Sequence, residues 1–251
     1  MPVEIELQIA CFLSHADLRR LRAVTVHLYD VASTVLYHSI FMHDVNAEKM
    51  IDELLFQHDT NCTLSRLSHP MLYIHSLSYY SFTDIYDEER LPRLAHILRD
   101  SVNIDIVTLQ PLGSSGVAVC QALYEGMHFV PGELQHDVLP VLKGVQTCSL
   151  TLLSMFLDAR DLRVVMLEDG PSGSALLQFL PFLSASGRAQ SMQSFGCTVM
   201  AIEVDTVLGH VAQTFQNLTH LCMQQTSSPV YPPPTATLQV CLTLMTALMI
   251  S

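Results

Sequence analysis

A short apolar pattern that recurs along the chain limits what this sequence can fold into. Clear copies of the form apolar-x-x-apolar-x-apolar begin at Ile104, Leu162, Met192 and Leu218. A further copy begins at Val145, and a looser one begins at Leu72, where His75 takes the middle apolar position. Short apolar runs of this kind are typical of buried strands. Stretches with helical periodicity lie between several of them, so a strand followed by a helix is the expected unit.

The spacing of these copies is close to regular. Strand-and-helix repeats run about 20–29 residues, with insertions. The intervals from Leu162 to Met192 and from Met192 to Leu218 are each close to one such repeat, and the interval from Ile104 to Leu162 is close to two. Val145 lies nearer to Leu162 than a full repeat allows, so this copy is either misplaced or part of an irregular repeat. The intervals therefore favour a repeat array.

Three stretches between the copies have the periodicity of amphipathic helices. They are residues 88–100, 174–184 and 204–215. The region as a whole resembles degenerate leucine-rich repeats, although the asparagine that usually ends the strand motif is missing throughout. An ordinary α/β domain with a parallel sheet is the alternative, because its strands also alternate with helices.

The first residues of the chain contain three short helical patterns. Their apolar residues are Ile5, Ile9, Phe12 and Leu13, then Leu18, Leu21 and Val24, then Leu28, Val31, Ala32, Val35 and Leu36. Pro2 suits a first helical turn, and Ser14 with Asp17 is a capping-box variant that predicts the second helix start. Three helices of this size bury too little area to be stable alone. They are either a cap on a larger domain or a docking module that completes its core on another protein.

The order of these residues resembles the F-box motif. The matching positions are Pro2-x-Glu4-Ile5-x-x-x-Ile9-x-x-x-Leu13 and Asp17-Leu18-x-x-Leu21-x-x-Val24. Met1 stands where the family usually has Leu, and no Trp occurs near the end of the motif. The resemblance implies docking on a Skp-type adaptor, which links F-box proteins to a cullin-RING ubiquitin ligase. It assigns the adaptor-binding surface to Pro2, Ile5, Ile9, Leu13, Leu18, Leu21 and Val24.

The expected architecture is therefore of the α+β or α/β class. A three-helix F-box module over residues 1–42 precedes an irregular leucine-rich-repeat solenoid over residues 43–251. In such an array the residues between the inward apolar positions face out from the stacked strands. They give the predicted target contacts Thr108, Gln110, Met166, Glu168, Thr198, His220 and Gln224.

The expected function is that of a substrate-recognition subunit of an SCF-type ligase, in which the repeats hold an unknown target protein. No catalytic residue of its own is expected. One alternative is a repeat-containing interaction scaffold with no ubiquitin role. Another is an α/β enzyme whose site the sequence does not reveal.

Composition and motifs narrow the classes of ligand. The net charge of −12 makes a nucleic-acid backbone an unfavourable partner. Seven cysteines without a CxxC pair, and twelve scattered histidines, give no metal-ligand spacing, so we expect neither metal nor cofactor. Residues 113–116 and 170–173 are not Gly-x-Ser-x-Gly and are predicted turns. The N-terminus lacks a basic signal region, so we expect reduced thiols and a cytoplasmic or nuclear location.

The last residues form an unusual tail. Four prolines between residues 229 and 234 precede an apolar run to the end of the chain. We expect this run to be a repeat helix without a polar cap, as in a truncated array or one whose end an oligomer covers. It is short of the roughly 20 residues that cross a bilayer, so a membrane anchor is the less favoured interpretation.

Overall fold

The structure is a computed structural model. It describes residues 2–59, 69–83, 87–112, 116–127, 138–157, 160–168, 173–226 and 239–243. The chain forms two compact units, Met1–Leu142 and Lys143–Ser251. The N-terminal helices belong to the same unit as the first strands, and the expected boundary after residue 42 stays a prediction.

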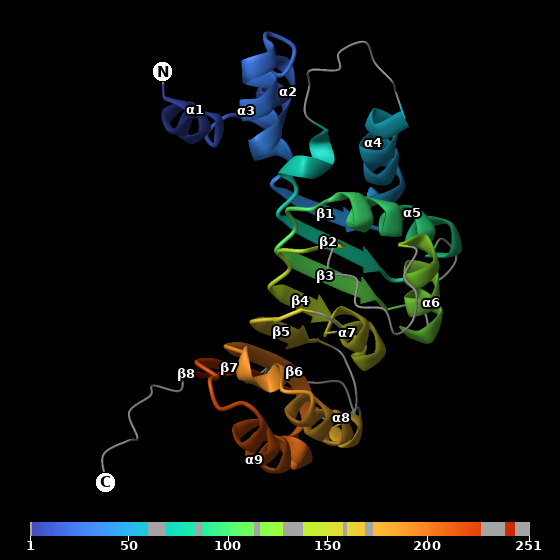
Figure 1. Cartoon of the computed structure of the whole chain (residues 1–251), viewed down its shortest axis with the longest axis vertical. Helices are drawn as coiled ribbons and strands as arrows, with labels where there is room; N and C mark the ends of the chain where they lie inside the picture. Colours follow the sequence, from blue (N-terminus) through green and yellow to red (C-terminus); the bar gives the residue numbers. More distant parts are fainter. Residues whose placement is uncertain are drawn as a thin grey trace. The chain divides into compact units, whose positions relative to one another are not determined.

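The first unit begins with the three predicted helices and continues with alternating strands and helices. Its helices are α1 (Val3–Ala10), α2 (His15–Leu21), α3 (Val26–Tyr37), α4 (Ala47–Asp59), α5 (Asp87–Asp100) and α6 (Gly116–Gly126). Its strands are β1 (Ser39–His43), β2 (Ser76–Ser81) and β3 (Ile106–Pro111), and a 3₁₀ helix, η1 (Pro70–Tyr73), precedes β2. Figure 1 shows α4, α5 and α6 side by side along these strands, so each helix covers the sheet next to its own strand.

The three strands of this unit are parallel and lie in chain order. Ile40 of β1 pairs with Leu77 of β2, and Leu77 pairs with Val107 of β3. These three side chains are buried against the helices. The register therefore stacks equivalent apolar residues, as neighbouring strand-and-helix units require to bury their apolar faces.

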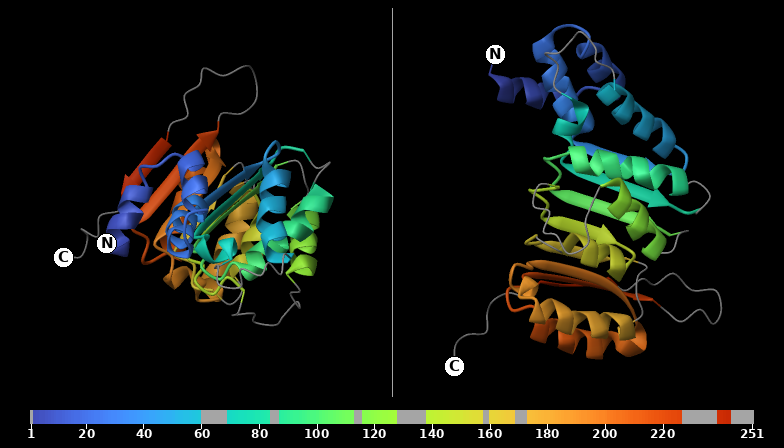
Figure 2. Two further views of the ribbon diagram at one scale, coloured as in Figure 1. Left: turned by 90° about the horizontal axis from the view of Figure 1, so that it is seen from above. Right: turned by 45° about the vertical axis from the view of Figure 1, so that its right-hand side comes forward.

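The second unit has the same alternation. Its strands are β4 (Gly144–Thr147), β5 (Val164–Leu167), β6 (Ser194–Met200), β7 (His220–Thr226) and β8 (Gln239–Thr243). Its helices are α7 (Leu150–Leu157), α8 (Gly173–Ala185) and α9 (Val204–Thr214), with 3₁₀ turns η3 (Arg188–Gln190) and η4 (Ala201–Glu203). Figure 2 shows from two directions that α8 and α9 lie side by side on one face of the strands.

The order of strands within the second unit confirms what the spacing predicted for it. Strands β4 to β7 are parallel neighbours in chain order. Val165 pairs with Phe195, and Phe195 pairs with Leu221, which gives a continuous ladder of buried residues. Phe215, just after α9, packs on Phe195 with ring centroids 4.9 Å apart. The three helices predicted between the strands are also present, as α5, α8 and α9.

Two predicted strands have a different register. The expected strand from Leu72 is wrong, because Leu72 lies in η1 and the strand begins at Ser76. Ile74, which is fully buried while Leu72 is exposed, is the first apolar position of that repeat. Near Val145, the strand is Gly144–Thr147, and Val145 pairs with Val165 of β5. Val165 is the second apolar position of the copy that begins at Leu162, so Val145 is also a second position and not a first. A strand-and-helix unit is present here, but it is short, with eight residues in α7.

The expected C-terminal helix is wrong over its described part. Residues Gln239–Thr243 form β8, which pairs with β7 in antiparallel register, Cys222 opposite Cys241. A parallel array leaves the backbone groups at one side of its last strand unpaired, and a returning strand satisfies them. Residues 227–238 and 244–251 lie outside the described residues, as do 113–115 and 170–172 of the predicted turns.

Candidate functional site

The three N-terminal helices pack around a small core of their own. Its buried residues are Ala10, Leu18, Val31 and Ala32, and Leu7, Leu13, Leu21, Val35 and Leu36 pack around them half-buried. The predicted capping box is present, because the Ser14 hydroxyl accepts a hydrogen bond of 3.2 Å from the Asp17 amide. Thr25 caps α3 in the same way, accepting from the Leu28 amide at 3.1 Å. These caps satisfy helix amides that a short helix would otherwise leave unpaired.

The residues predicted to bind an adaptor divide into two groups. Pro2, Ile5, Ile9 and Val24 are exposed, and Leu13 and Leu21 are half-buried within the module. Leu18 is only 1% exposed, so its assignment to the binding surface is corrected. Its side chain points from α2 into the contact with α1 and α3, and there it holds the module together.

Further apolar residues join the exposed group. The N-terminal apolar surface, as we define it, consists of Val3, Ile5, Ile9, Phe12, Val24 and Val26. Phe12 follows the end of α1 and is 90% exposed, although sequence periodicity had placed it on the helical stripe. The His27 ring at the start of α3 hydrogen-bonds the Glu6 carboxylate, which brings Val26 beside α1. Large apolar side chains exposed together mark interaction sites.

A cluster of polar and aromatic side chains fixes this module to the first strand-and-helix repeat. Arg22 donates to the hydroxyls of Tyr37, at 2.7 Å, and Tyr29, at 2.9 Å, and lies over both rings. Tyr37 donates in turn to the Glu53 carboxylate of α4 at 2.9 Å. Burial raises the pKa of Tyr37 to about 12, against the opposing effect of the Arg22 charge. We name this cluster the Arg22 brace.

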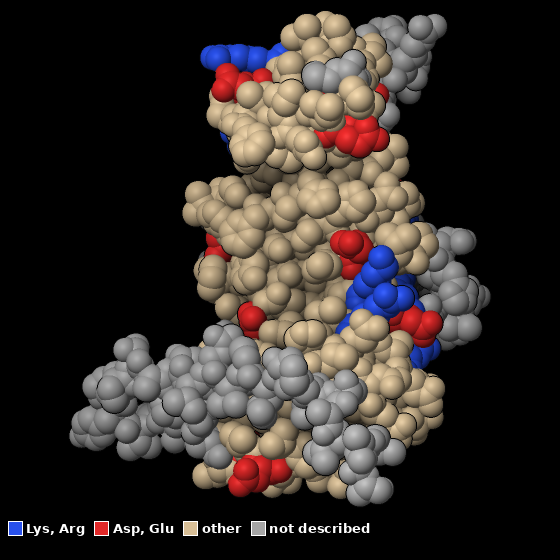
Figure 3. Space-filling view, turned by 90° about the vertical axis from the view of Figure 1, so that its left-hand side faces the viewer, with Lys and Arg blue, Asp and Glu red and all other residues tan. Residues whose placement is uncertain are grey.

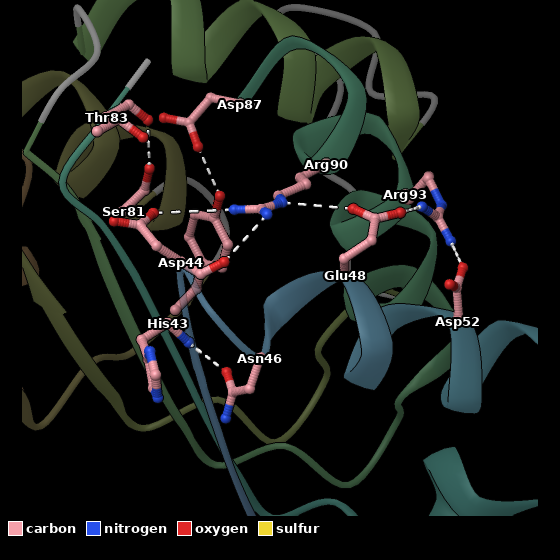
Figure 4. A network of polar contacts seen from close by, with 11 residues as sticks. His43, Asp44, Asn46, Glu48, Asp52, Ser81, Thr83, Asp87, Arg90 and Arg93 are labelled. Carbon is pink, nitrogen blue, oxygen red and sulfur yellow. Dashed lines mark hydrogen bonds and ion pairs between the residues drawn. The ribbon is translucent and has the colours of Figure 1, made fainter. Parts of the chain in front are cut away.

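A second polar network ties the first two repeats to each other (Figure 4). Arg90 of α5 is 5% exposed, and it donates to the Asp44 carbonyl at 3.1 Å and the Glu48 carboxylate at 3.4 Å. Tyr79 of β2 donates to Asp87 at 2.5 Å, and burial together with this bond raises the pKa of Tyr79. Arg93 pairs with Glu48 and with Asp52 of α4.

Both arginines of this network face carboxylates, and the remaining carboxylate, Asp87, accepts a tyrosine hydroxyl. Removing one partner of a buried ion pair destabilises a protein, because the other charge is left unpaired. We therefore interpret the network as structural.

The helix-free face of each unit is the candidate target-binding surface. In the first unit, Thr108 and Gln110 are 4% and 2% exposed, so their prediction as target contacts is corrected. They lie on the expected face of β3 and are buried there. Phe41 and Tyr80 are on the same face, with ring centroids 5.3 Å apart, and Phe41 is exposed. The sequence pattern had assigned no role to these aromatic residues.

In the second unit, the predicted contacts gather around a small depression. Met166, Glu168, Thr198 and Gln224 line it, together with Leu167, Cys197 and Cys222. His220, also predicted, is exposed at the start of β7. The depression has a volume of about 50 Å³, far below the roughly 300 Å³ at which small-molecule sites begin. Its size suits the end of one side chain.

Charged groups are few around these strands. Figure 3 shows one face of the molecule, on which most atoms belong to uncharged residues and the charged side chains stand in small groups. Within the described residues, no three His, Cys, Asp or Glu side chains come close enough to hold a metal ion. No described helix is both long and apolar enough to cross a membrane.

Asparagine side chains contribute to the array at positions that the sequence pattern had missed. Asn103 donates to the carbonyl of Leu72 in the preceding repeat at 2.6 Å, and Asn217 donates to the carbonyl of Gln190 at 2.8 Å. Both asparagines come directly before the first apolar residue of their repeat. The asparagine that usually ends the strand motif is absent, and in these two repeats an asparagine before the strand bonds the preceding repeat. A comparison of the residues before Ile104 and Leu218 could have revealed this shared position.

Comparison with known proteins leaves the family open. No protein-family model matches the chain, and a search of curated proteins finds no match. The functional argument therefore rests on the two surfaces described above.

Proposed function

We propose that this chain is a substrate-recognition subunit of an SCF-type ubiquitin ligase. The N-terminal apolar surface binds a Skp-type adaptor, and the helix-free faces of the strands hold the target protein. The observation that carries the proposal is the pairing of F-box-like sequence with exposed apolar side chains at Ile5, Ile9 and Val24. Several large apolar side chains exposed on one small module are typical of an interaction site.

The Arg22 brace supports this division of roles. A receptor that presents a target to a separate enzyme works by holding the target close to that enzyme. Its docking module and its recognition region therefore have to be connected rigidly. Tyr37 ends α3 and also begins the first repeat, and it contacts both Arg22 and Glu53. Tyr73 of η1 adds a second link, donating to Asp30 of α3 at 2.5 Å.

Co-purification tests the proposal. The full chain, co-expressed with a Skp-type adaptor, should elute with it as a stoichiometric complex and with better yield than the chain alone. A soluble chain that elutes separately from the adaptor would remove the ubiquitin role. It would favour the alternative of an interaction scaffold, for which the strand faces remain the binding surface.

A further inference from the structure

The depression on the second unit has one row of polar side chains at its edge. Leu167 and Cys197 are register partners; Glu168 comes directly after β5, and Thr198 follows Cys197 on β6. Thr198 in turn pairs with Gln224. Neighbouring strands lie about 4.8 Å apart, so the carboxylate, the hydroxyl and the amide stand in a line. All three groups offer oxygen atoms that accept hydrogen bonds.

Among the described residues that line the depression, Glu168 is the only one that carries a charge at neutral pH. Its side chain is half-buried, and no Lys, Arg or His of the described residues forms an ion pair with it. Arg163 precedes β5 while Glu168 follows it, so the length of the strand separates the two charges. A carboxylate in a partly desolvated position is stabilised by a cation from outside.

The remainder of the depression is apolar. Met166 lies over Gly196, where an added Cβ would come within 2.2 Å of the Met166 sulfur, and Cys222 pairs with Gly196 on the other side. Gly196 therefore leaves room for the Met166 side chain, which forms part of the apolar lining of the depression. A space of about 50 Å³ holds roughly four water molecules. An aliphatic stem with a small polar head fits such a site.

We propose that the depression binds a lysine side chain of an extended segment of the target protein. The ammonium group has three donors, and Glu168, Thr198 and Gln224 provide acceptors for them. The stem of the lysine lies on Met166 and Cys222. The chain has 24 acidic and 12 basic residues, and its negative net charge favours the approach of a basic partner. This inference deepens the proposed function, because it rests on the strand face as the target-binding surface.

A displayed library of random linear nonapeptides tests the inference on the full chain. Selection should enrich lysine at one fixed position. Replacing that lysine by norleucine in a selected peptide should weaken binding by about two- to fivefold, as expected for a partly exposed charge pair. Glu168→Gln should weaken the lysine peptide by a similar factor, whereas Gln224→Glu should tighten it. The matched control is Asp205→Asn, exposed on α9, which should leave binding unchanged.

Each other outcome overturns the inference. These outcomes are selected peptides without a fixed lysine, no selected peptide, or equal affinity for Glu168→Gln with the fold retained by circular dichroism. Adaptor binding, measured on the same proteins, separates this result from the proposed function. A chain that binds the adaptor but no lysine peptide refutes only the inference. A chain that binds lysine peptides but no adaptor refutes only the ubiquitin role.

Discussion

The guanidinium of Arg22 lies 4.5 Å from the centroid of the Tyr29 ring and 5.0 Å from that of Tyr37. It thus stacks on one residue from the first turn of α3 and on one from its end, while Tyr37 reaches Glu53 in α4. This contact therefore stabilises the junction between the N-terminal helices and the first strand-and-helix repeat.

Removing the Arg22 side chain should weaken this junction. Arg22→Ala loses two hydrogen bonds and the stacking, for which we expect a loss of about 1–3 kcal/mol in the free energy of unfolding. Chemical denaturation measures it. The control is Arg20→Ala, an exposed arginine paired with Asp17, which should cost less than about 0.5 kcal/mol. Equal losses for the two variants would show that the brace contributes nothing.

The same cluster should make the protein sensitive to alkali. Tyr37 ionises near pH 10 in the unfolded chain and at about 12 in the folded protein, where burial disfavours the tyrosinate and raises the pKa. Above pH 10 the unfolded state therefore binds fewer protons than the folded one, and stability falls as the pH rises toward 12. Urea denaturation across this range should show a shallower fall for Tyr37→Phe. An unchanged slope would contradict the role of Tyr37.

The asparagines before the strands should stabilise the array by bonding the previous repeat. Asn103→Asp and Asn217→Asp keep the shape of the side chain but remove its donor, and each should cost about 1 kcal/mol. Gln178→Glu, exposed on α8, makes the same chemical change without a bond to lose. Thermal denaturation compares the three. If the control variant lowers the melting temperature as much, the asparagine bonds are not the cause.

Glu203 should cap α8 across the repeat boundary. Its carboxylate accepts from the Gly173 amide at 3.3 Å, and a Cβ on Gly173 would lie 2.4 Å from the carboxyl carbon. Gly173→Ala should displace the carboxylate and cost roughly 0.5–1 kcal/mol. In a Glu203→Ala background the same substitution should cost less, because the cap is already lost. Additive effects in this double-mutant cycle would argue against the contact.

The repeat could be predicted from the sequence because its core positions are apolar at fixed offsets. The patterns from Ile104, Leu162, Met192 and Leu218 place the buried residues of four strands correctly. The first repeat, with Tyr37, Ile40 and Met42 buried, is hidden from the pattern because Tyr37 is also the last residue of α3 and residues 1–42 match the F-box pattern. A residue that serves two elements satisfies two periodicities, and the sequence alone does not separate them.

The site was less predictable, for a different reason. Helical periodicity identifies an apolar face but not which of its residues pack inside the module. Leu18 and Ile9 have equivalent places in the pattern, yet the first is buried and the second is 49% exposed. Thr108 of β3 and Thr198 of β6 are both predicted to face out from their strands, but Thr108 is buried and Thr198 is half-buried beside the depression. Tertiary packing decides both cases.

The most direct test of the account is a calorimetric titration of the full chain with a purified Skp-type adaptor. Ile9→Asp combined with Phe12→Asp places charges on the N-terminal apolar surface without touching its core, so it should abolish binding. The control is Ile202→Asp, an apolar residue of the second unit that is 87% exposed, and this variant should bind as the unmodified chain does. Saturable binding that is lost only in the double variant is the predicted result. Absence of binding by the unmodified chain, or undiminished binding by the double variant, would contradict the account.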